Sequence, residues 1–148
     1  MTRLIGPDEF SSALDEIFSD VQLAANNGVK EAVGVGIRKG ASAWRKNAKE
    51  AFGRGKNSHT YKRGGQRYST GEYAASIRGH VIDRSEEHPA GEIGSPTLPG
   101  LPHLLEFGHA KVGGGRVNGI EHVKPAADEA FEDAFAAAEK KIEEGLRG

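Results

Sequence analysis

Four side chains in the second half of the chain are of types that bind metal ions: His103, Glu106, His109 and His122. A histidine and a glutamate three residues apart can share one helix face, and a later histidine could complete a site that activates water. However, the spacing matches no recognised zinc signature, and prolines and glycines interrupt the helix that would carry the ligands. We therefore expect exposed or hydrogen-bonded histidines, with a metal-dependent hydrolase as a less favoured hypothesis.

Other catalytic motifs are weak. The third glycine of the segment Gly34–Gly40 comes one position too late for a dinucleotide-binding fingerprint, and segment 53–58 lacks the spacing of a phosphate-binding loop. The chain has no cysteine and no nucleophile elbow, so no residue can be named as a catalytic nucleophile. We predict a protein that is not an enzyme and that needs no cofactor or metal.

Glu106 lies between two large apolar residues, Leu105 and Phe107. If this segment docks on the core, the carboxylate is partly buried and needs backbone amides or an arginine as hydrogen-bond donors. An exposed carboxylate on a short helical turn is an equally good interpretation of the same residues.

The surrounding segment, 98–127, must position these groups. Pro99, Gly100 and Pro102 predict irregular structure up to about His103, because proline lacks an amide donor and disfavours helix in the residue before it. A short apolar cluster should then dock on the core, and it consists of Leu104, Leu105 and Phe107.

Glycines should end this docked turn. Gly108 is placed to adopt a positive φ, and a glycine-rich loop follows at about 110–117. The last helix should run from Pro125 to about Glu144, since proline is favoured in the first turn. Its buried face should consist of Ala127, Ala130, Phe131, Ala134, Phe135, Ala138 and Ile142.

A long helix should occupy the N-terminal third. From Phe10 to Phe52, apolar residues recur in steps of mostly three, four or five, which predicts one apolar stripe with Trp44 in the core. Interior glycines weaken this helix by about 1 kcal/mol each relative to alanine. Either the helix breaks near 26–28 or 34–36, or the glycines allow close packing against another element or subunit.

Short strands are predicted at 73–83, 91–94 and 116–123. They could form a small antiparallel sheet with helices on one face. The length of 148 residues suits a single domain, 1–148. The predicted fold class is α+β, with a long N-terminal helix, a small antiparallel sheet and a long C-terminal helix.

Charge is distributed unevenly, although the net charge is only -1. Residues 37–84 carry 12 basic and 3 acidic side chains, whereas residues 1–36 carry 2 and 6, and residues 85–148 carry 6 and 12. Such segregation predicts contact with an anionic partner or pairing between neighbouring copies. No segment approaches the roughly 20 apolar residues of a membrane span, so we expect no membrane contact.

The most basic stretch should be a flexible loop at about 53–71. Its candidate contacts with a partner or with DNA are Arg54, Lys56, Lys62, Arg63 and Arg67. Two tyrosines between these cations could stack on bases. We favour a solvated loop that orders against a partner protein, and the alternative is a nucleic-acid-binding module that uses the basic segment 38–84.

The chain carries three short motifs in order, at 70–77, 104–108 and 124–127, and together they resemble the head-to-tail joining or tail-completion family of long-tailed bacteriophages. Residues 70–77 are similar to a Thr-Gly-x-Leu-x-x-Ser-Ile motif, with Tyr73 where leucine is common. Leu-Leu-Glu-Phe-Gly at 104–108 and Lys-Pro-Ala-Ala at 124–127 are the other two. The resemblance implies a structural role for Gly71, Ser76, Glu106, Phe107, Gly108, Pro125 and Ala126. The loop at 53–68 is longer and more basic than the family's pattern, so its role is not inherited.

This resemblance implies a non-catalytic structural protein of a phage or prophage particle, acting in head–tail joining or tail completion at the neck. It implies a ring of identical subunits, a hexamer or a dodecamer, that binds connector and tail proteins around the axis through which DNA leaves. We therefore expect the protein in the virion, and in the host cytoplasm during assembly.

Overall fold

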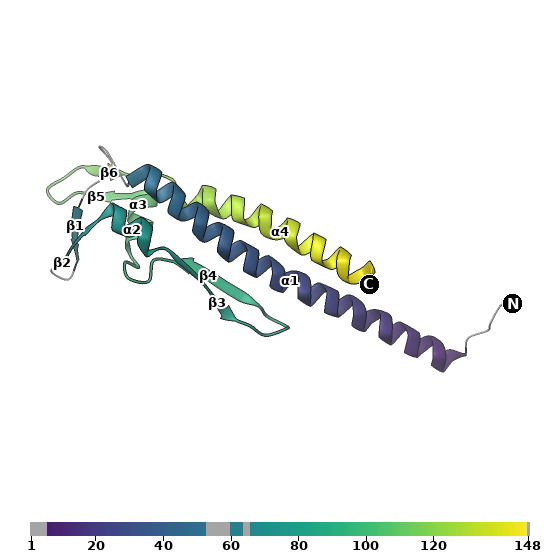
Figure 1. Cartoon of the computed structure of the whole chain (residues 1–148). Helices are drawn as coiled ribbons and strands as arrows, with labels where there is room; N and C mark the ends of the chain where they lie inside the picture. Colours follow the sequence, from purple (N-terminus) through teal and green to yellow (C-terminus); the bar gives the residue numbers. More distant parts are fainter. Residues whose placement is uncertain (1–5, 53–59, 64–65, 148) are drawn as a thin grey trace.

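The computed structural model describes residues 6–52, 60–63 and 66–147. The elements in chain order are α1 (Pro7–Phe52), β1 (Thr60–Arg63), β2 (Gln66–Ser69), α2 (Thr70–Ser76), β3 (Arg78–Asp83), β4 (Ala90–Gly94), α3 (Leu101–Phe107), β5 (Gly108–Ala110), β6 (Arg116–Asn118) and α4 (Val123–Arg147). Figure 1 shows α1 and α4 side by side, with α1 reaching well beyond the end of α4. The predicted α+β class, with long helices at both ends of the sequence, is confirmed.

Helix α1 is continuous over 46 residues, or about 70 Å at 1.5 Å per residue. The break near 26–28 or 34–36 does not occur, because the glycines serve close packing instead. A Cβ atom on Gly28 would lie 2.5 Å from Cγ1 of Ile142 in α4, and one on Gly40 would lie 3.2 Å from Cβ of Ala130. The glycines therefore let α4 approach the backbone of α1.

The predicted buried face of α4 is partly wrong. Ala130 is buried as predicted, but Ala127 is exposed and its neighbour Ala126 is buried instead. Phe131 and Phe135 are 71% and 60% exposed and stack on each other with ring centroids 6.4 Å apart. The glycines of α1 let the backbones of the two helices approach closely. The narrow space between them takes alanine side chains but no phenyl ring. The large residues of α4 therefore lie on its outer side.

The strands form three separate antiparallel pairs, β1–β2, β3–β4 and β5–β6, and not the single sheet that we predicted. The strand predicted at 91–94 is present in β4. The strand predicted at 73–83 begins only at Arg78, because Tyr73 and Ile77 are both fully buried, a spacing that suits one face of a helical turn. The strand predicted at 116–123 ends at Asn118 and pairs with β5.

The predicted basic loop at 53–71 contains regular structure. Its backbone forms a hairpin in which Lys62 is paired with Arg67 and Arg63 with Gln66, and α2 begins at Thr70. The described residues 60–63 and 66–71 therefore contain paired strands and the start of α2, which the prediction of a loop did not include. The other two candidate contacts, Arg54 and Lys56, lie outside the described residues.

The segment before Glu106 also differs from the prediction. Helix α3 begins at Leu101, two residues earlier than expected, because Pro102 falls in its first turn, where no amide donor is required. Of the predicted docked cluster only Leu105 is buried, while Leu104 and Phe107 are 41% and 63% exposed. Gly108 has a φ of +80°, as predicted, and its path brings it against the backbone of Val117 and Gly119.

The hydrophobic core lies around the C-terminal half of α1, where α2, α3 and the start of α4 meet. Its buried members are Trp44, Ala48, Phe52, Tyr73, Ala74, Ile77, Leu98, Leu105 and Ala126. None of the helices formed by the described residues has the length and apolar character needed to cross a bilayer.

Candidate functional site

Glu106 is buried and caps the start of α4. Its Oε2 accepts hydrogen bonds from the backbone amides of His122 at 3.0 Å and Val123 at 2.7 Å, and its Oε1 accepts one from Lys124 at 3.2 Å. The first amides of a helix have no partner within the helix, and here a carboxylate from α3 supplies it. Of the two interpretations of the sequence, the partly buried carboxylate with amide donors is confirmed.

His122 continues the hydrogen bonds of Glu106 into the core. Its Nδ1 lies 2.8 Å from the carbonyl oxygen of Ile120 and 3.0 Å from Oε2 of Glu106, and its Nε2 lies 2.7 Å from the hydroxyl of Tyr73. Trp44 donates its indole hydrogen to the same hydroxyl at 2.8 Å. We call Trp44, Tyr73, His122 and Glu106 the core network.

The two ring nitrogens of His122 have different kinds of neighbour. Both neighbours of Nδ1 are acceptors, so we assign the imidazole proton to Nδ1. Trp44 donates to the hydroxyl oxygen of Tyr73, and the same hydroxyl lies within hydrogen-bonding distance of Nε2 of His122. The ring nitrogens of Trp44 and His122 therefore all have hydrogen-bond partners although they are buried.

Burial raises the pKa of Glu106, but the three backbone amides and the neighbouring His122 lower it further than burial raises it. The pKa of this carboxyl therefore lies below its ordinary value. The carboxylate stays charged at neutral pH, the form that can accept all three amides.

The core network lies inside the protein. Tyr73 is 0%, His122 1% and Glu106 7% exposed. The network joins α1, α2, α3 and the start of α4, which are the elements that make up the core.

The predicted metal ligands do not converge. Glu106 and His122 are in contact, whereas His103 lies against the ring of Phe107 with centroids 4.9 Å apart. Within the described part of the chain, no group of three histidine, aspartate or glutamate side chains is placed to hold a metal ion.

The residues that carry the resemblance to the phage family fall around the same junction. Ser76 donates to the carbonyl oxygen of Tyr73 at 2.6 Å, and its hydroxyl lies 2.5 Å from that of Ser95. Ala126 is buried in the core, whereas Pro125 in the first turn of α4 is exposed, and Gly71 near the start of α2 is half-buried. The motif residues thus lie mainly where α2, α3 and α4 meet, and not around an open site.

The sequence predicted the amide donors of Glu106 but not its link through His122 to Tyr73 and Trp44. A signal was present at Tyr73, which stands where the family motif has leucine. A buried tyrosine needs a hydrogen-bond partner for its hydroxyl, and this requirement predicts a polar neighbour in the core. The identity of that neighbour depends on how α4 is placed, which short-range patterns do not define.

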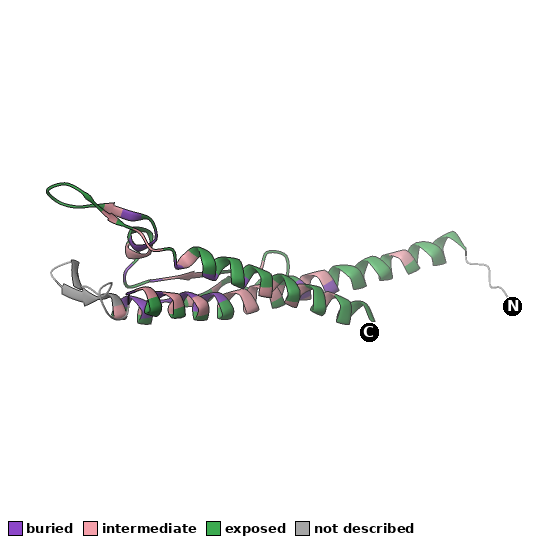
Figure 2. Ribbon diagram, turned by 90° about the horizontal axis from the view of Figure 1, so that it is seen from above, coloured by how far each residue is buried: buried purple, intermediate pink, exposed green. Residues whose placement is uncertain are grey.

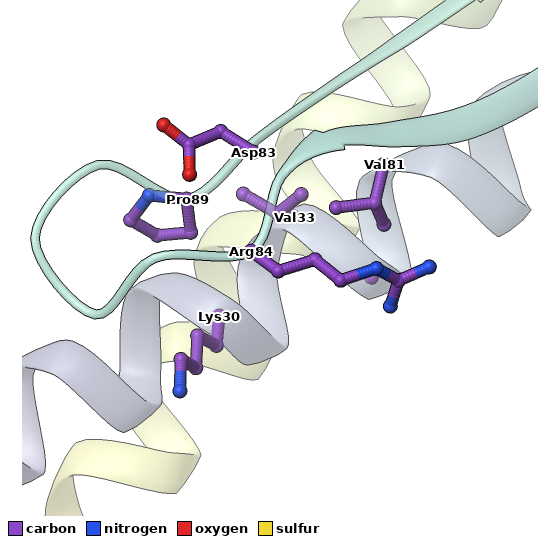
Figure 3. Close-up of a pocket in the computed structure, with 7 residues that line it drawn as sticks. Lys30, Val33, Val81, Asp83, Arg84 and Pro89 are labelled. Atoms are coloured by element: carbon purple, nitrogen blue, oxygen red, sulfur yellow. The ribbon is translucent and has the colours of Figure 1, made fainter.

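A cleft of about 260 Å³ lies between α1 and the β3–β4 hairpin. Its lining consists of Lys30, Val33, Gly34, Val81, Asp83, Arg84 and Pro89. Figure 3 shows the charged ends of Lys30, Asp83 and Arg84 pointing in three different directions. A ligand site needs a few polar groups that converge on one point, so we do not assign this cleft a ligand.

The first part of α1 is the largest feature without a structural explanation inside the monomer. We call residues 7–23 the arm, and Figure 2 shows almost all of it exposed. Four of its large apolar side chains, spaced along one face, are between 47% and 65% exposed: Phe10, Ile17, Phe18 and Val21. Single exposed apolar residues are ordinary, but a row of them on one element is typical of an interaction surface.

A second apolar surface lies at the opposite end of the molecule. A shallow groove of about 200 Å³ between α3 and the start of α4 is lined by Pro102, His103, Glu106, Phe107, Val123 and Lys124. We call it the α3–α4 groove. Figure 1 places the arm at one end of α1 and α3 near the other end, so one copy of the chain cannot join the two surfaces.

Comparison of the chain with protein-family models, curated protein sequences and solved structures found no match.

Proposed function

We propose that this chain is a non-catalytic structural subunit of a phage or prophage particle, which joins head and tail at the neck as part of an oligomeric ring. The sequence resemblance described above supports the choice of particle. The observation that carries an assembly role is the arm, a helical surface with exposed phenylalanine, isoleucine and valine side chains.

Exposed apolar area on this scale favours association. Full burial of one such side chain stabilises a contact by about 1.5–3 kcal/mol, so four of them would supply much of the free energy of a subunit interface. In the proposed particle the ring would bind connector and tail proteins and would surround the path of the DNA. The protein would occur in the virion and, during assembly, in the host cytoplasm.

The test is the native mass by light scattering over a range of concentrations, with negative-stain images of any large species. The proposal expects a closed ring, in particular a hexamer or a dodecamer. A monomer at every concentration would contradict self-assembly of the isolated chain.

A second candidate function is nucleic-acid binding, favoured by one observation. The exposed side of the second half of α1 carries Arg38, Lys39, Lys46 and Lys49. Cations along a helix suit the phosphate backbone, and binding of this kind weakens steeply with salt. A mobility-shift titration at low salt that shows no bound DNA would remove this candidate.

A further inference from the structure

We propose that the arm of one copy of this chain docks in the α3–α4 groove of a second copy. The inference rests on the proposed self-assembly and names the two surfaces that meet. It is independent of which particle the assembly belongs to.

The apolar face of the arm continues the face of α1 that α4 covers. Gly28 and Ala24 pack against Ile142 and Gly145 of α4. Going toward the N-terminus, the same face continues in steps of three and four residues at Val21, Ile17, Leu14 and Phe10. The described part of α4 covers this face as far as Ala24, and the large apolar side chains of the arm beyond it are largely exposed. The arm is therefore a helix with a binding face already formed.

The groove offers the matching apolar surface. The ring of Phe107 is 63% exposed, and Pro102 and Val123 complete the apolar lining. A volume of about 200 Å³ takes one or two large side chains such as Phe18 or Ile17, but not a drug-sized ligand. An amphipathic helix laid with its apolar residues in a hydrophobic groove is a common mode of recognition.

Charge favours this pairing over the pairing of two arms. Every charged residue between Pro7 and Val29 is acidic: Asp8, Glu9, Asp15, Glu16 and Asp20. Two arms side by side would bring like charges together. The groove side carries charges of both signs: Lys124, which is paired with Asp128 at 3.0 Å, the carboxylate of Glu106, and Arg116, whose guanidinium donates to the carbonyl oxygen of Phe107 at 2.7 Å. A surface of mixed charge opposes an acidic helix less than a second acidic arm does.

A contact between two different surfaces has a defined consequence for assembly. Each copy offers one arm and one groove, so copies join head to tail, and the chain of contacts closes when the rotation between neighbours permits. This geometry suits a ring, whereas two paired arms would end at a dimer.

The absence of cysteine from the chain makes a direct test available. Two single-cysteine variants, Phe18→Cys and Phe107→Cys, are treated with a short thiol-to-thiol cross-linker separately and as a mixture. The proposal expects a cross-linked pair of chains in the mixture and little in either variant alone. Leu23→Cys replaces Phe18→Cys as the control, because Leu23 is 56% exposed but lies on the opposite side of the arm from the apolar face.

A second pair of variants tests the same contact without cross-linking. Ile17 and Leu23 are 55% and 56% exposed, so a glutamate at either position costs the monomer equally little. Ile17→Glu should raise the concentration for half-assembly by about tenfold or more, whereas Leu23→Glu should leave it within about twofold.

The outcomes separate the inference from the proposed function. Rings in light scattering without a cross-link in the mixture would overturn the inference and leave the ring standing. Cross-linking of Phe18→Cys alone would show that arms pair with each other, which overturns the inference as well. A monomer at every concentration would overturn both.

Discussion

The two halves of α1 have the same periodicity but opposite environments. From Ala24 to Phe52 the helix buries glycine, alanine and aromatic residues against α4, the β3–β4 hairpin and α2. From Pro7 to Leu23 it carries apolar residues at the same spacing, and all of the large ones except the half-buried Leu14 are exposed. Periodicity alone therefore identifies the face of a helix that is to be buried, but not the chain that will bury it.

Charge also distinguishes the two halves. The arm has only acidic charges, whereas the exposed side of the second half carries Arg38, Lys39, Lys46 and Lys49. A single helix thus changes the sign of its charge along its length. The packed half is stabilised within the monomer, and we expect the arm to be stabilised only in an assembly.

Phe52→Ala and Phe18→Ala give the sharpest contrast and the largest expected effect. Phe52 is 3% exposed and packs edge-to-face on His122 with ring centroids 5.0 Å apart, whereas Phe18 is 65% exposed. Phe52→Ala should lower the free energy of unfolding by about 3–5 kcal/mol, since it leaves a cavity. Phe18→Ala should change it by less than about 0.5 kcal/mol.

Urea denaturation of both variants, at protein concentrations where the parent chain is monomeric, gives the two free energies. If Phe18→Ala lowered the free energy of unfolding as much as Phe52→Ala, the arm would be packed within the monomer, contrary to the contrast drawn between the two halves of α1.

Glu106→Gln tests the hydrogen bonds by which Glu106 holds α3 to the start of α4. The Gln amide group can accept hydrogen bonds at its oxygen only, so at least one of the amides of His122, Val123 and Lys124 would face an NH₂ group. We expect a loss of about 1–3 kcal/mol at neutral pH. Glu129→Gln, an exposed carboxylate in α4, is the matched control and should cost little.

The effect of Glu106 should depend on pH in one direction. Its pKa is lower in the folded chain than the ordinary value of 4.5, so its contribution to stability is complete above that pH. The contribution is lost as the pH falls through the folded-state pKa. The difference in unfolding free energy between the parent and Glu106→Gln should therefore be constant from about pH 6 to 8 and shrink below about pH 4.5. A difference that grew on acidification would contradict this role for Glu106.

The sequence predicted well those features that depend on near neighbours. The long helices follow from apolar spacing, the positive φ of Gly108 from its place after an apolar turn, and the need of Glu106 for amide donors from its flanking residues. Predictions failed where the outcome depended on distant contacts. The exposure of Phe131 and Phe135 follows from the glycines of α1, and the core network required Trp44, Tyr73 and His122 to meet from three elements.

The hairpin within the basic stretch was missed for a different reason. Residues 60–69 contain glycine and many cations, a composition that favours a loop in isolation. Pairing of β1 with β2, and the joining of β2 to α2 at Thr70, give this backbone hydrogen-bonded partners that composition does not reveal.

The smallest predicted effects come from two glycines of α1 that differ in their surroundings. At Gly34 an added methyl group would meet only the end of the Arg38 side chain at 3.4 Å, so Gly34→Ala should stabilise the helix by about 0.5–1 kcal/mol. At Gly28 the same methyl group would lie 2.5 Å from Cγ1 of Ile142 and 3.2 Å from the backbone oxygen of Ala138. Gly28→Ala should therefore lose about 1–2 kcal/mol despite the better helix propensity of alanine. Thermal unfolding of both variants shows whether each substitution stabilises or destabilises the protein. A gain in stability at both positions would mean that α4 shifts away from α1 to make room for the methyl group. Both glycines lie in the packed half of α1, so opposite signs would distinguish the face of this half that α4 covers from the face that lines the cleft.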